Sequence, residues 1–182
     1  HFELLPDTEN EIIFLGNSIT DGCEWAELFQ NPNIKNRGIG GDDTDGVLER
    51  LDEIISSKPS KIFIMIGTND MAYGKTVDYV VSNYTKIIDS IQIICPDTKI
   101  YIQSVLPVDD AIHYTRSTSD IMQINTHLEK LSAEKSIEYI ELFSIFSNDD
   151  NKLNPDYSLD GLHLNGKGYQ VWKEAIQKYV EE

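Results

Sequence analysis

Residues 61–67 read Lys-Ile-Phe-Ile-Met-Ile-Gly and give the clearest strand signal in the chain. The run is β-branched and aromatic, and a glycine closes it. Residues 12–16 repeat the pattern as Ile-Ile-Phe-Leu-Gly, with an apolar part too short for a helix. Continuous apolar strands of this kind are typical of a parallel sheet that is covered on both faces.

Further strands and helices are predicted on both sides of these two segments. Three more strands are predicted over residues 34–37, 100–105 and 137–142. Helices are predicted over residues 21–29, 43–56, 77–95, 119–134 and 167–180, and a long polar loop over 148–165. Five strands, each followed by a helix or loop–helix segment, predict an α/β fold. We expect a three-layer α/β/α sandwich with a five-stranded parallel, flavodoxin-like sheet.

Length, composition and charge limit the classes of partner. A chain of 182 residues with 40% hydrophobic and 25% charged residues is expected to form a single globular domain over residues 1–182. Its 15 basic and 31 acidic residues give a net charge of −16, which argues against nucleic acid and anionic lipid surfaces as partners. No apolar run approaches the roughly 18 residues of a membrane-spanning helix. Whether the protein is a monomer or a homodimer stays open.

Cysteine usage predicts no disulfide framework. Cys23 and Cys95 are too few for a disulfide scaffold and form no Cys-x-x-Cys motif. Because they are placed near opposite edges of the predicted sheet, we expect two buried free thiols.

Unusual residues follow three of the predicted strands. The strand ends read Gly-Asn-Ser-Ile-Thr at 16–20, Gly-Ile-Gly-Gly at 38–41 and Gly-Thr-Asn-Asp at 67–70. In a parallel sheet the carboxyl ends of the strands share one edge, and ligands bind there. The topology therefore predicts a functional site built from these three segments.

Ser18 is a candidate nucleophile, because it lies in a tight turn between a buried strand and the next helix. Taken alone, it could equally be a helix cap, which is a common use of serine. The surrounding residues do not match the Gly-x-Ser-x-Gly elbow of α/β-hydrolases, since Thr20 stands where that motif has glycine.

A serine nucleophile needs a base, and His163 is the best candidate. It follows Asp160 by three residues with Gly161 between them, so the carboxylate can curl back to the imidazole and fix its tautomer. The spacing alone is weak and could be incidental. His113, in a loop, and His127, in a predicted helix, are expected to have surface or packing roles.

Asn69 and Gly40 are candidate donors to a negatively charged oxygen. The Asn69 amide could donate a hydrogen bond or only cap its turn. Gly40 could offer an unshielded N–H or only serve the turn conformation. Together with Ser18 and the Asp160–His163 pair, they supply nucleophile, base, orienting acid and oxyanion donors, which is the set that acyl transfer requires.

Four segments of the chain resemble the sequence blocks of the SGNH (GDSL) hydrolase family. They appear in the family's order and cover nearly the whole chain: residues 16–21, 36–42, 67–70 and 160–164. The variant is similar to the branch with the platelet-activating-factor acetylhydrolase catalytic subunits and bacterial carbohydrate O-acetylesterases. Asn17 stands where the family name has Asp, at a position outside the triad.

The resemblance implies a role for each candidate. Ser18 is expected to be the nucleophile, His163 the general base and Asp160 the residue that orients His163. The N–H groups of Ser18 and Gly40 and the side chain of Asn69 are expected to form the oxyanion hole.

No cofactor and no metal are expected. Asp43 stands where a dinucleotide-binding Gly-x-Gly-x-x-Gly motif needs its last glycine, and no Walker A lysine motif is present. The acidic residues at 42, 43 and 45 miss the spacing of an EF-hand, and there is no His-Glu-x-x-His motif.

The predicted function is therefore that of a serine esterase. We expect it to remove a short acyl group, preferably acetyl, from a small or carbohydrate ester through an acyl-serine intermediate. Asn17, Tyr73 and the loop 107–118 are candidates for shaping the substrate pocket. A local basic patch from Lys75, Arg116 and Lys167 could offset the overall negative charge.

Two alternatives and the location stay open at this stage. A lysophospholipase or thioesterase of the same family is one alternative, and a non-catalytic carbohydrate-binding module on the same scaffold is the other. The sequence begins at His1, and residues 1–10 lack the basic start and apolar core of a signal peptide. We expect export to a periplasm or beyond with a leader upstream of this sequence, while a cytoplasmic location stays possible.

Overall fold

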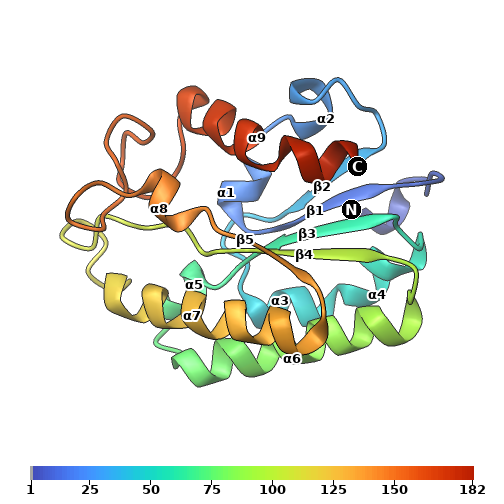
Figure 1. Ribbon diagram of the computed structural model, residues 1–182, viewed down its shortest axis with the longest axis horizontal. Coiled ribbons are helices and arrows are strands. Elements are labelled where there is room, and N and C mark those ends of the chain that lie inside the picture. Colours follow the sequence, from blue (N-terminus) through green and yellow to red (C-terminus); the bar gives the residue numbers. More distant parts are fainter. Residues whose placement is uncertain (1) are drawn as a thin grey trace.

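The computed structural model describes residues 2–182 and contains one five-stranded parallel sheet (Figure 1). The strand order is β2-β1-β3-β4-β5, which is the flavodoxin-like order. The strands are β1 (Ile12–Gly16), β2 (Ile34–Gly38), β3 (Lys61–Met65), β4 (Lys99–Gln103) and β5 (Glu138–Ile140). All four pairings are parallel, so the predicted sheet is confirmed.

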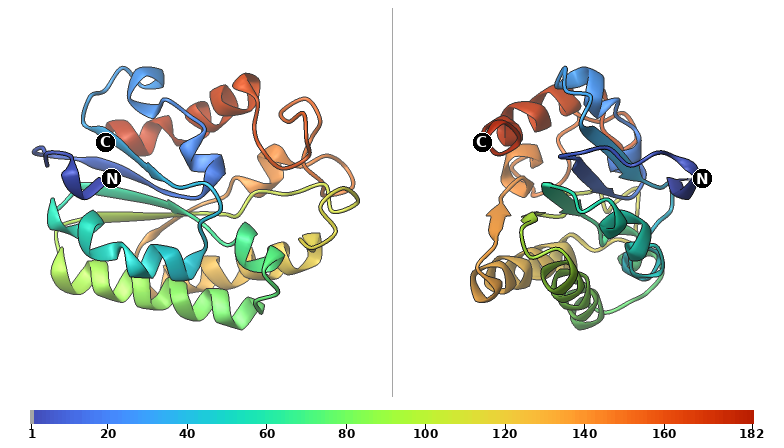
Figure 2. Two further views of the ribbon diagram at one scale, coloured as in Figure 1. Left: turned by 180° about the vertical axis from the view of Figure 1, so that it is seen from behind. Right: turned by 90° about the vertical axis from the view of Figure 1, so that its right-hand side faces the viewer.

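Helices cover both faces of the sheet and complete the three layers. One face carries α1 (Ser18–Asp21), α2 (Trp25–Leu28) and α9 (Gly166–Glu181). The other carries α3 (Thr44–Glu49), α4 (Leu51–Ser56), α6 (Val77–Ile94) and α7 (Thr118–Lys135), with α5 (Thr68–Ala72) after β3. The one-turn helices η1 (Phe2–Leu4) and α8 (Phe143–Phe146) complete the set. The end-on view in Figure 2 shows the sheet between the two helical layers.

A stack of aromatic rings crosses the sheet beneath α2 and α9. The register aligns Phe14 with Phe63 and Phe63 with Tyr101, and the ring centroids lie 5.0 and 4.5 Å apart. Trp25 of α2 and Trp172 of α9 pack edge to face 4.8 Å apart above this stack. Since each large side chain contributes about 1.5–3 kcal/mol when fully buried, this stack is a principal anchor of the helical layer.

Two predicted helices differ from the structure. In place of one helix over 21–29 the chain forms two single turns, α1 and α2, over residues 18–28, because Asn36 of β2 donates hydrogen bonds to the backbone carbonyls of Thr20, Asp21 and Cys23 and holds this stretch in a turn. The segment 43–56 divides at Arg50, which leaves helical geometry with φ −111° and ψ 10°. Its guanidinium donates to the backbone carbonyls of Gly16 and Arg37.

The longer elements agree with the prediction to within a few residues. Helices α6, α7 and α9 are all present, whereas the short helices α5 and α8 were not predicted. Residues 148–165 are irregular apart from the bridges Ser147↔Leu153 and Ser158↔Leu164. Cys23 and Cys95 are buried and free, as expected.

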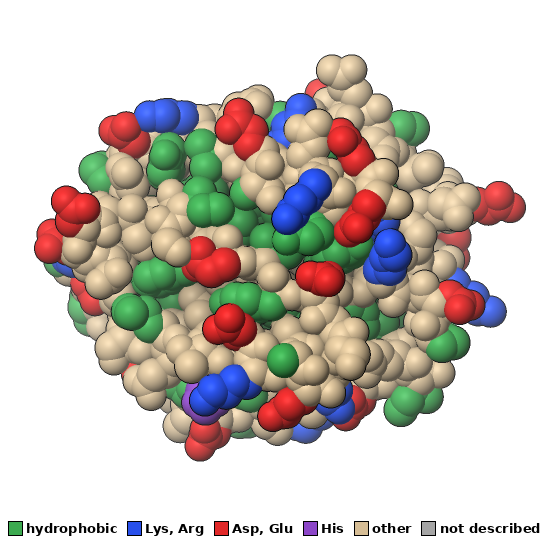
Figure 3. All heavy atoms as spheres, viewed as in Figure 1, with side chains coloured by type: hydrophobic (Ala, Val, Ile, Leu, Met, Phe, Trp, Pro, Cys, Tyr) green, Lys and Arg blue, Asp and Glu red, His purple; other side chains and the backbone are tan. Residues whose placement is uncertain are grey.

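On the face drawn in Figure 3, the acidic side chains are dispersed among other groups and do not form one cluster. Within residues 2–182, no helix is both long and apolar enough to cross a membrane.

Candidate active site

Ser18 lies at the carboxyl end of β1, as the first residue of α1. The cap of this helix is Asn17, whose Oδ1 accepts a hydrogen bond from the Ile19 N–H at 3.0 Å. The alternative that Ser18 is the cap is therefore wrong. Close approach of the turn to β2 requires glycine at position 38, because a Cβ there would lie 2.2 Å from the Asp21 nitrogen.

Ser18, His163 and Asp160 form one continuous hydrogen-bonded chain. Ser18 Oγ lies 3.0 Å from His163 Nε2, and His163 Nδ1 lies 2.7 Å from Asp160 Oδ2. Asp160 Oδ1 also accepts hydrogen bonds from the backbone N–H groups of Leu162 and His163. Partial burial acts to raise the pKa of the Asp160 carboxyl, but the hydrogen bonds from His163 and the backbone outweigh it and hold that pKa well below its ordinary value. An ionised Asp160 keeps the proton on Nδ1, which leaves Nε2 as the acceptor that faces Ser18.

The loop that carries Asp160 and His163 is braced by the segment 109–113. Gly161 adopts φ +79°, and a Cβ there would lie 2.9 Å from the Cβ of Asp109. Its carbonyl accepts from the Asp109 N–H at 2.8 Å. His113 Nε2 lies 2.8 Å from the Asp160 carbonyl and must donate, because a carbonyl oxygen only accepts. His113 therefore packs against the back of the triad, while His127 is exposed on α7.

The oxyanion candidates Gly40 and Asn69 follow β2 and β3, the two strands that flank β1. Gly40 is exposed, and within residues 2–182 no heavy atom would lie within 4 Å of a Cβ at this position. The adjoining Gly41 carbonyl accepts a hydrogen bond from Tyr73 Oη at 3.0 Å. Asn69 is buried, and its Nδ2 donates to the Asp42 carbonyl at 2.9 Å. The loop 39–42 and the first turn of α5 are thereby joined.

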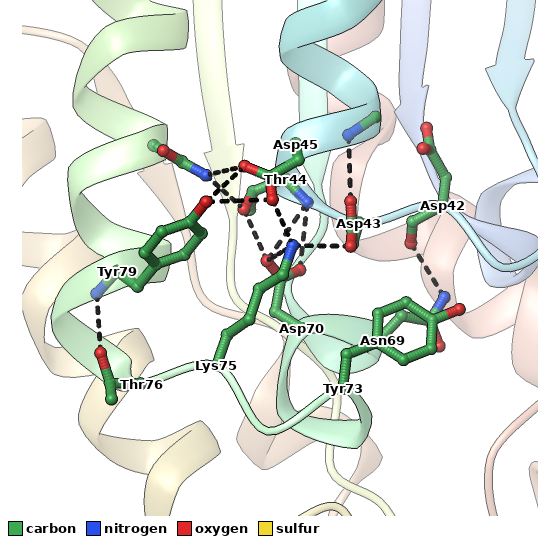
Figure 4. A network of polar contacts seen from close by, with 12 residues as sticks. Asp42, Asp43, Thr44, Asp45, Asn69, Asp70, Tyr73, Lys75, Thr76 and Tyr79 are labelled. Carbon is green, nitrogen blue, oxygen red and sulfur yellow. Dashed lines mark hydrogen bonds and ion pairs between the residues drawn. The ribbon is translucent and has the colours of Figure 1, made fainter.

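A partly buried polar network links the start of α3, directly after this loop, to α5 and Lys75 (Figure 4). Asp70 is fully buried and accepts hydrogen bonds from both the N–H and the Oγ1 hydroxyl of Thr44. Lys75 Nζ contacts Asp43 Oδ2 at 2.7 Å and Asp45 Oδ2 at 2.6 Å. Burial acts to lower the pKa of Lys75, but its contacts with Asp43 and Asp45 raise it above the ordinary value. This network was not predicted, although Asp70 belongs to a segment that the sequence analysis singled out.

Two of the three residues of the predicted basic patch are neutralised by carboxylates. Lys75 is held by Asp43 and Asp45, and Lys167 pairs with Asp156 at 2.8 Å. Arg116 instead donates from Nη2 to Asn69 Oδ1 at 3.0 Å. The three cations therefore do not form one free basic surface.

Comparison with known proteins assigns the chain to a family. The sequence model of the GDSL-like Lipase/Acylhydrolase family matches residues 14–171. The chain belongs to this family. Platelet-activating factor acetylhydrolase IB subunit alpha2 of Gallus gallus is 30% identical over 188 residues, which cover 97% of this chain and 80% of the relative. Members of the GDSL-like family hydrolyse esters, so the protein is an ester hydrolase.

Solved structures of GDSL proteins share the fold. A GDSL-like lipase from Bacteroides thetaiotaomicron matches with a TM-score of 0.86 and 25% identity, covering 99% of this chain and 93% of that one. A variant of the acetyl-xylooligosaccharide esterase Axe2 from Geobacillus has a TM-score of 0.77 at 16% identity, covering 95% and 94%. The second likeness concerns the fold alone.

The rim of the GDSL site is open and partly apolar. Leu159 next to Asp160, Ile112 and Tyr114 on either side of His113, and Tyr73 at the end of α5 are exposed large side chains. A hollow of about 240 Å³ beside His163 is lined by Leu159, Asp160, His163, Leu164 and Asn165. Asn17 is buried and its side chain caps α1, so it does not reach this surface in the structure. Larger hollows of about 620 Å³ lie around Lys99 and Glu182 at the opposite edge of the sheet, and none of their described lining residues is a histidine.

Proposed function

We propose that this GDSL protein is a serine esterase that removes a short acyl group, acetyl in the first place, from a small or carbohydrate ester. The activity would reside in one domain spanning residues 1–182, with Ser18 as nucleophile. The observation that carries the proposal is the chain of contacts from Ser18 Oγ through the His163 imidazole to Asp160, at 3.0 and 2.7 Å.

Acylation begins when Ser18 Oγ attacks the ester carbonyl carbon. His163 Nε2 accepts the hydroxyl proton as the C–O bond forms, and Asp160 stabilises the resulting imidazolium. The carbonyl oxygen becomes an oxyanion that receives hydrogen bonds from the N–H groups of Ser18 and Gly40 and from Asn69 Nδ2. Collapse breaks the bond to the alcohol, which leaves with the proton from His163.

Deacylation follows the same steps with water as the nucleophile. His163 takes a proton from the water molecule as its oxygen attacks the acyl carbon of the acylated Ser18. The second oxyanion accepts hydrogen bonds from the same three donors. Its collapse returns the proton to Ser18 Oγ and releases the carboxylic acid, so the enzyme is regenerated.

The preference for a short acyl group is supported by a relative of the chain. The relative from Gallus gallus is itself an acetylhydrolase. Tyr73 offers an exposed ring whose Oη is tied to the Gly41 carbonyl, and such a ring can pack against the apolar face of a sugar.

One observation favours the lysophospholipase or thioesterase alternative. Ile112, Tyr114 and Leu159 expose apolar surface near the triad, and a longer acyl chain could lie against them. The acyl chain length therefore distinguishes the two candidate activities.

The test uses p-nitrophenyl esters of increasing chain length and a fluorophosphonate probe. We expect kcat/KM to be highest with the acetate and the probe to label Ser18. Preference for octanoate over acetate would favour the lipase-like alternative. No labelling and no turnover of any ester would reject the esterase and favour a carbohydrate-binding role, which a titration with acetylated oligosaccharides would then check.

A further inference from the structure

The Asn69 amide has two partners of opposite hydrogen-bonding character. Arg116 Nη2 lies 3.0 Å from Asn69 Oδ1, and the Asp42 carbonyl oxygen lies 2.9 Å from Asn69 Nδ2. A guanidinium can only donate and a carbonyl can only accept. Rotating the amide by 180° would place its N–H groups against the guanidinium and its oxygen against a carbonyl. The contacts therefore define which end of the amide is nitrogen.

This orientation bears on the proposed reaction, because an amide nitrogen carries two N–H groups. The Asp42 carbonyl takes one of them, and the second is left for another acceptor. A reversed amide would present its carbonyl oxygen in place of Nδ2 and repel an oxyanion. Correct orientation of Asn69 is thus a condition for its use as a donor.

Arg116 is distinguished from the other arginines by what its side chain contacts. Arg37 pairs with Glu53 and Arg50 with Asp42, whereas no ion pair links Arg116 to a carboxylate within residues 2–182. Its one side-chain hydrogen bond in this part of the chain goes to Asn69. A charge-assisted bond of this kind is about twice as strong as a neutral one, and it also polarises the amide it contacts.

The backbone around Arg116 is held in place by other contacts. The Arg116 N–H donates to the His113 carbonyl at 2.8 Å, and Lys152 Nζ contacts Asp109 Oδ1 at 2.9 Å. The guanidinium is half-buried, so it gives up part of its hydration to contact the amide.

We propose that Arg116 is a positioning residue, which holds the Asn69 amide with its free N–H directed toward the oxyanion that forms at Ser18. This inference rests on the proposed ester hydrolysis and assigns Arg116 no contact with the substrate. Its effect on the reaction therefore passes through Asn69 alone.

A double-mutant cycle tests the inference with p-nitrophenyl acetate. Arg116→Ala is expected to lower kcat by about 10–100-fold with little change in KM, since small misplacements of a reacting group cost up to that much. In an Asn69→Ala background, Arg116→Ala is expected to change kcat by less than about twofold, because the amide that it orients is already gone. Arg116→Lys, which keeps a donor, should recover part of the loss.

Lys152→Ala is the matched control. It removes a cation that braces the same loop through Asp109 and Asp110 without contacting Asn69. Any effect of Lys152→Ala should be the same in the presence and absence of the Asn69 amide. Thermal unfolding of each variant, and labelling of Ser18 by the fluorophosphonate, verify that the fold and the nucleophile are intact.

Two outcomes would overturn the inference. A rise in KM without loss of kcat would mean that Arg116 binds substrate. Equal losses from Arg116→Ala with and without Asn69 would mean that it acts independently of the amide. Failure of the wild-type protein to react with the ester or the probe would instead reject the proposed function.

Discussion

The two halves of the candidate site are held in different ways. Ser18 and Asn69 follow directly on central strands of the sheet, and Asn69 is only 6% exposed. Asp160 and His163 belong to the irregular segment 148–165, and their side chains are 51% and 45% exposed. The first half is fixed by strand packing, whereas the second depends on contacts between loops. The reaction requires both halves. Substitutions in each half should therefore separate effects on catalysis from effects on the stability of the fold.

Ser18→Ala should produce the largest loss of activity, because it removes the proposed nucleophile from the strand-held half. We expect kcat to fall by a factor on the order of 10⁶ with acetate esters. Stability should change little, since Asn17 and not Ser18 caps α1. Steady-state kinetics and thermal unfolding check the two parts. Retention of turnover would contradict the role of Ser18.

Asp160→Asn tests the loop-held half with a side chain of nearly the same size. An amide at this position no longer fixes the imidazole tautomer, and we expect kcat to fall by about 10⁴. Since the pKa of Asp160 is lowered in the folded state, its ionised form stabilises the protein above the ordinary carboxyl pKa. That stabilisation is lost as the pH falls through the folded-state pKa.

Urea unfolding of wild type and Asp160→Asn measures this difference. The stability gap between them should be larger at pH 7 than at pH 3. If the difference in unfolding free energy between the two proteins does not become smaller on acidification, the charge of the Asp160 carboxylate does not stabilise the loop.

Asn69→Ala should cost less than either triad substitution. One donor to the proposed oxyanion contributes on the order of 10²–10³ in kcat, so a loss of this size is expected with KM little changed. Serine labelling by a fluorophosphonate should slow but persist, because Ser18 and His163 stay in contact. A loss confined to KM would place Asn69 in substrate binding.

The division between strand-held and loop-held segments also explains which parts of the structure could be predicted from the sequence. The sheet, α6, α7 and α9 have long apolar patterns, and their prediction is confirmed. The single-turn helices α5 and α8 are too short for a helical period to be recognised. The spacing of Asp160 and His163 suggested their pairing, since the motif is local.

Contacts between loops had no such local signal. Asp109 of the loop 107–118 contacts Lys152 and Gly161, which lie more than 30 residues further along the chain. The bond from Arg116 to Asn69 joins residues 47 positions apart, so neither residue type nor spacing indicated it. Likewise, the ion pairs of Lys75 with Asp43 and Asp45 join segments on either side of β3.

A pair of glycine substitutions compares the support of the two halves directly, with the smallest expected effects. Gly161→Ala places a Cβ at φ +79° and against Asp109, and the left-handed backbone alone should cost about 1–2 kcal/mol of folding stability. Gly40→Ala meets no described heavy atom within 4 Å and should change stability by less than about 0.5 kcal/mol. Urea denaturation midpoints at constant m-value measure both. Equal destabilisation by the two variants would contradict the backbone constraint at Gly161 and its close packing against Asp109.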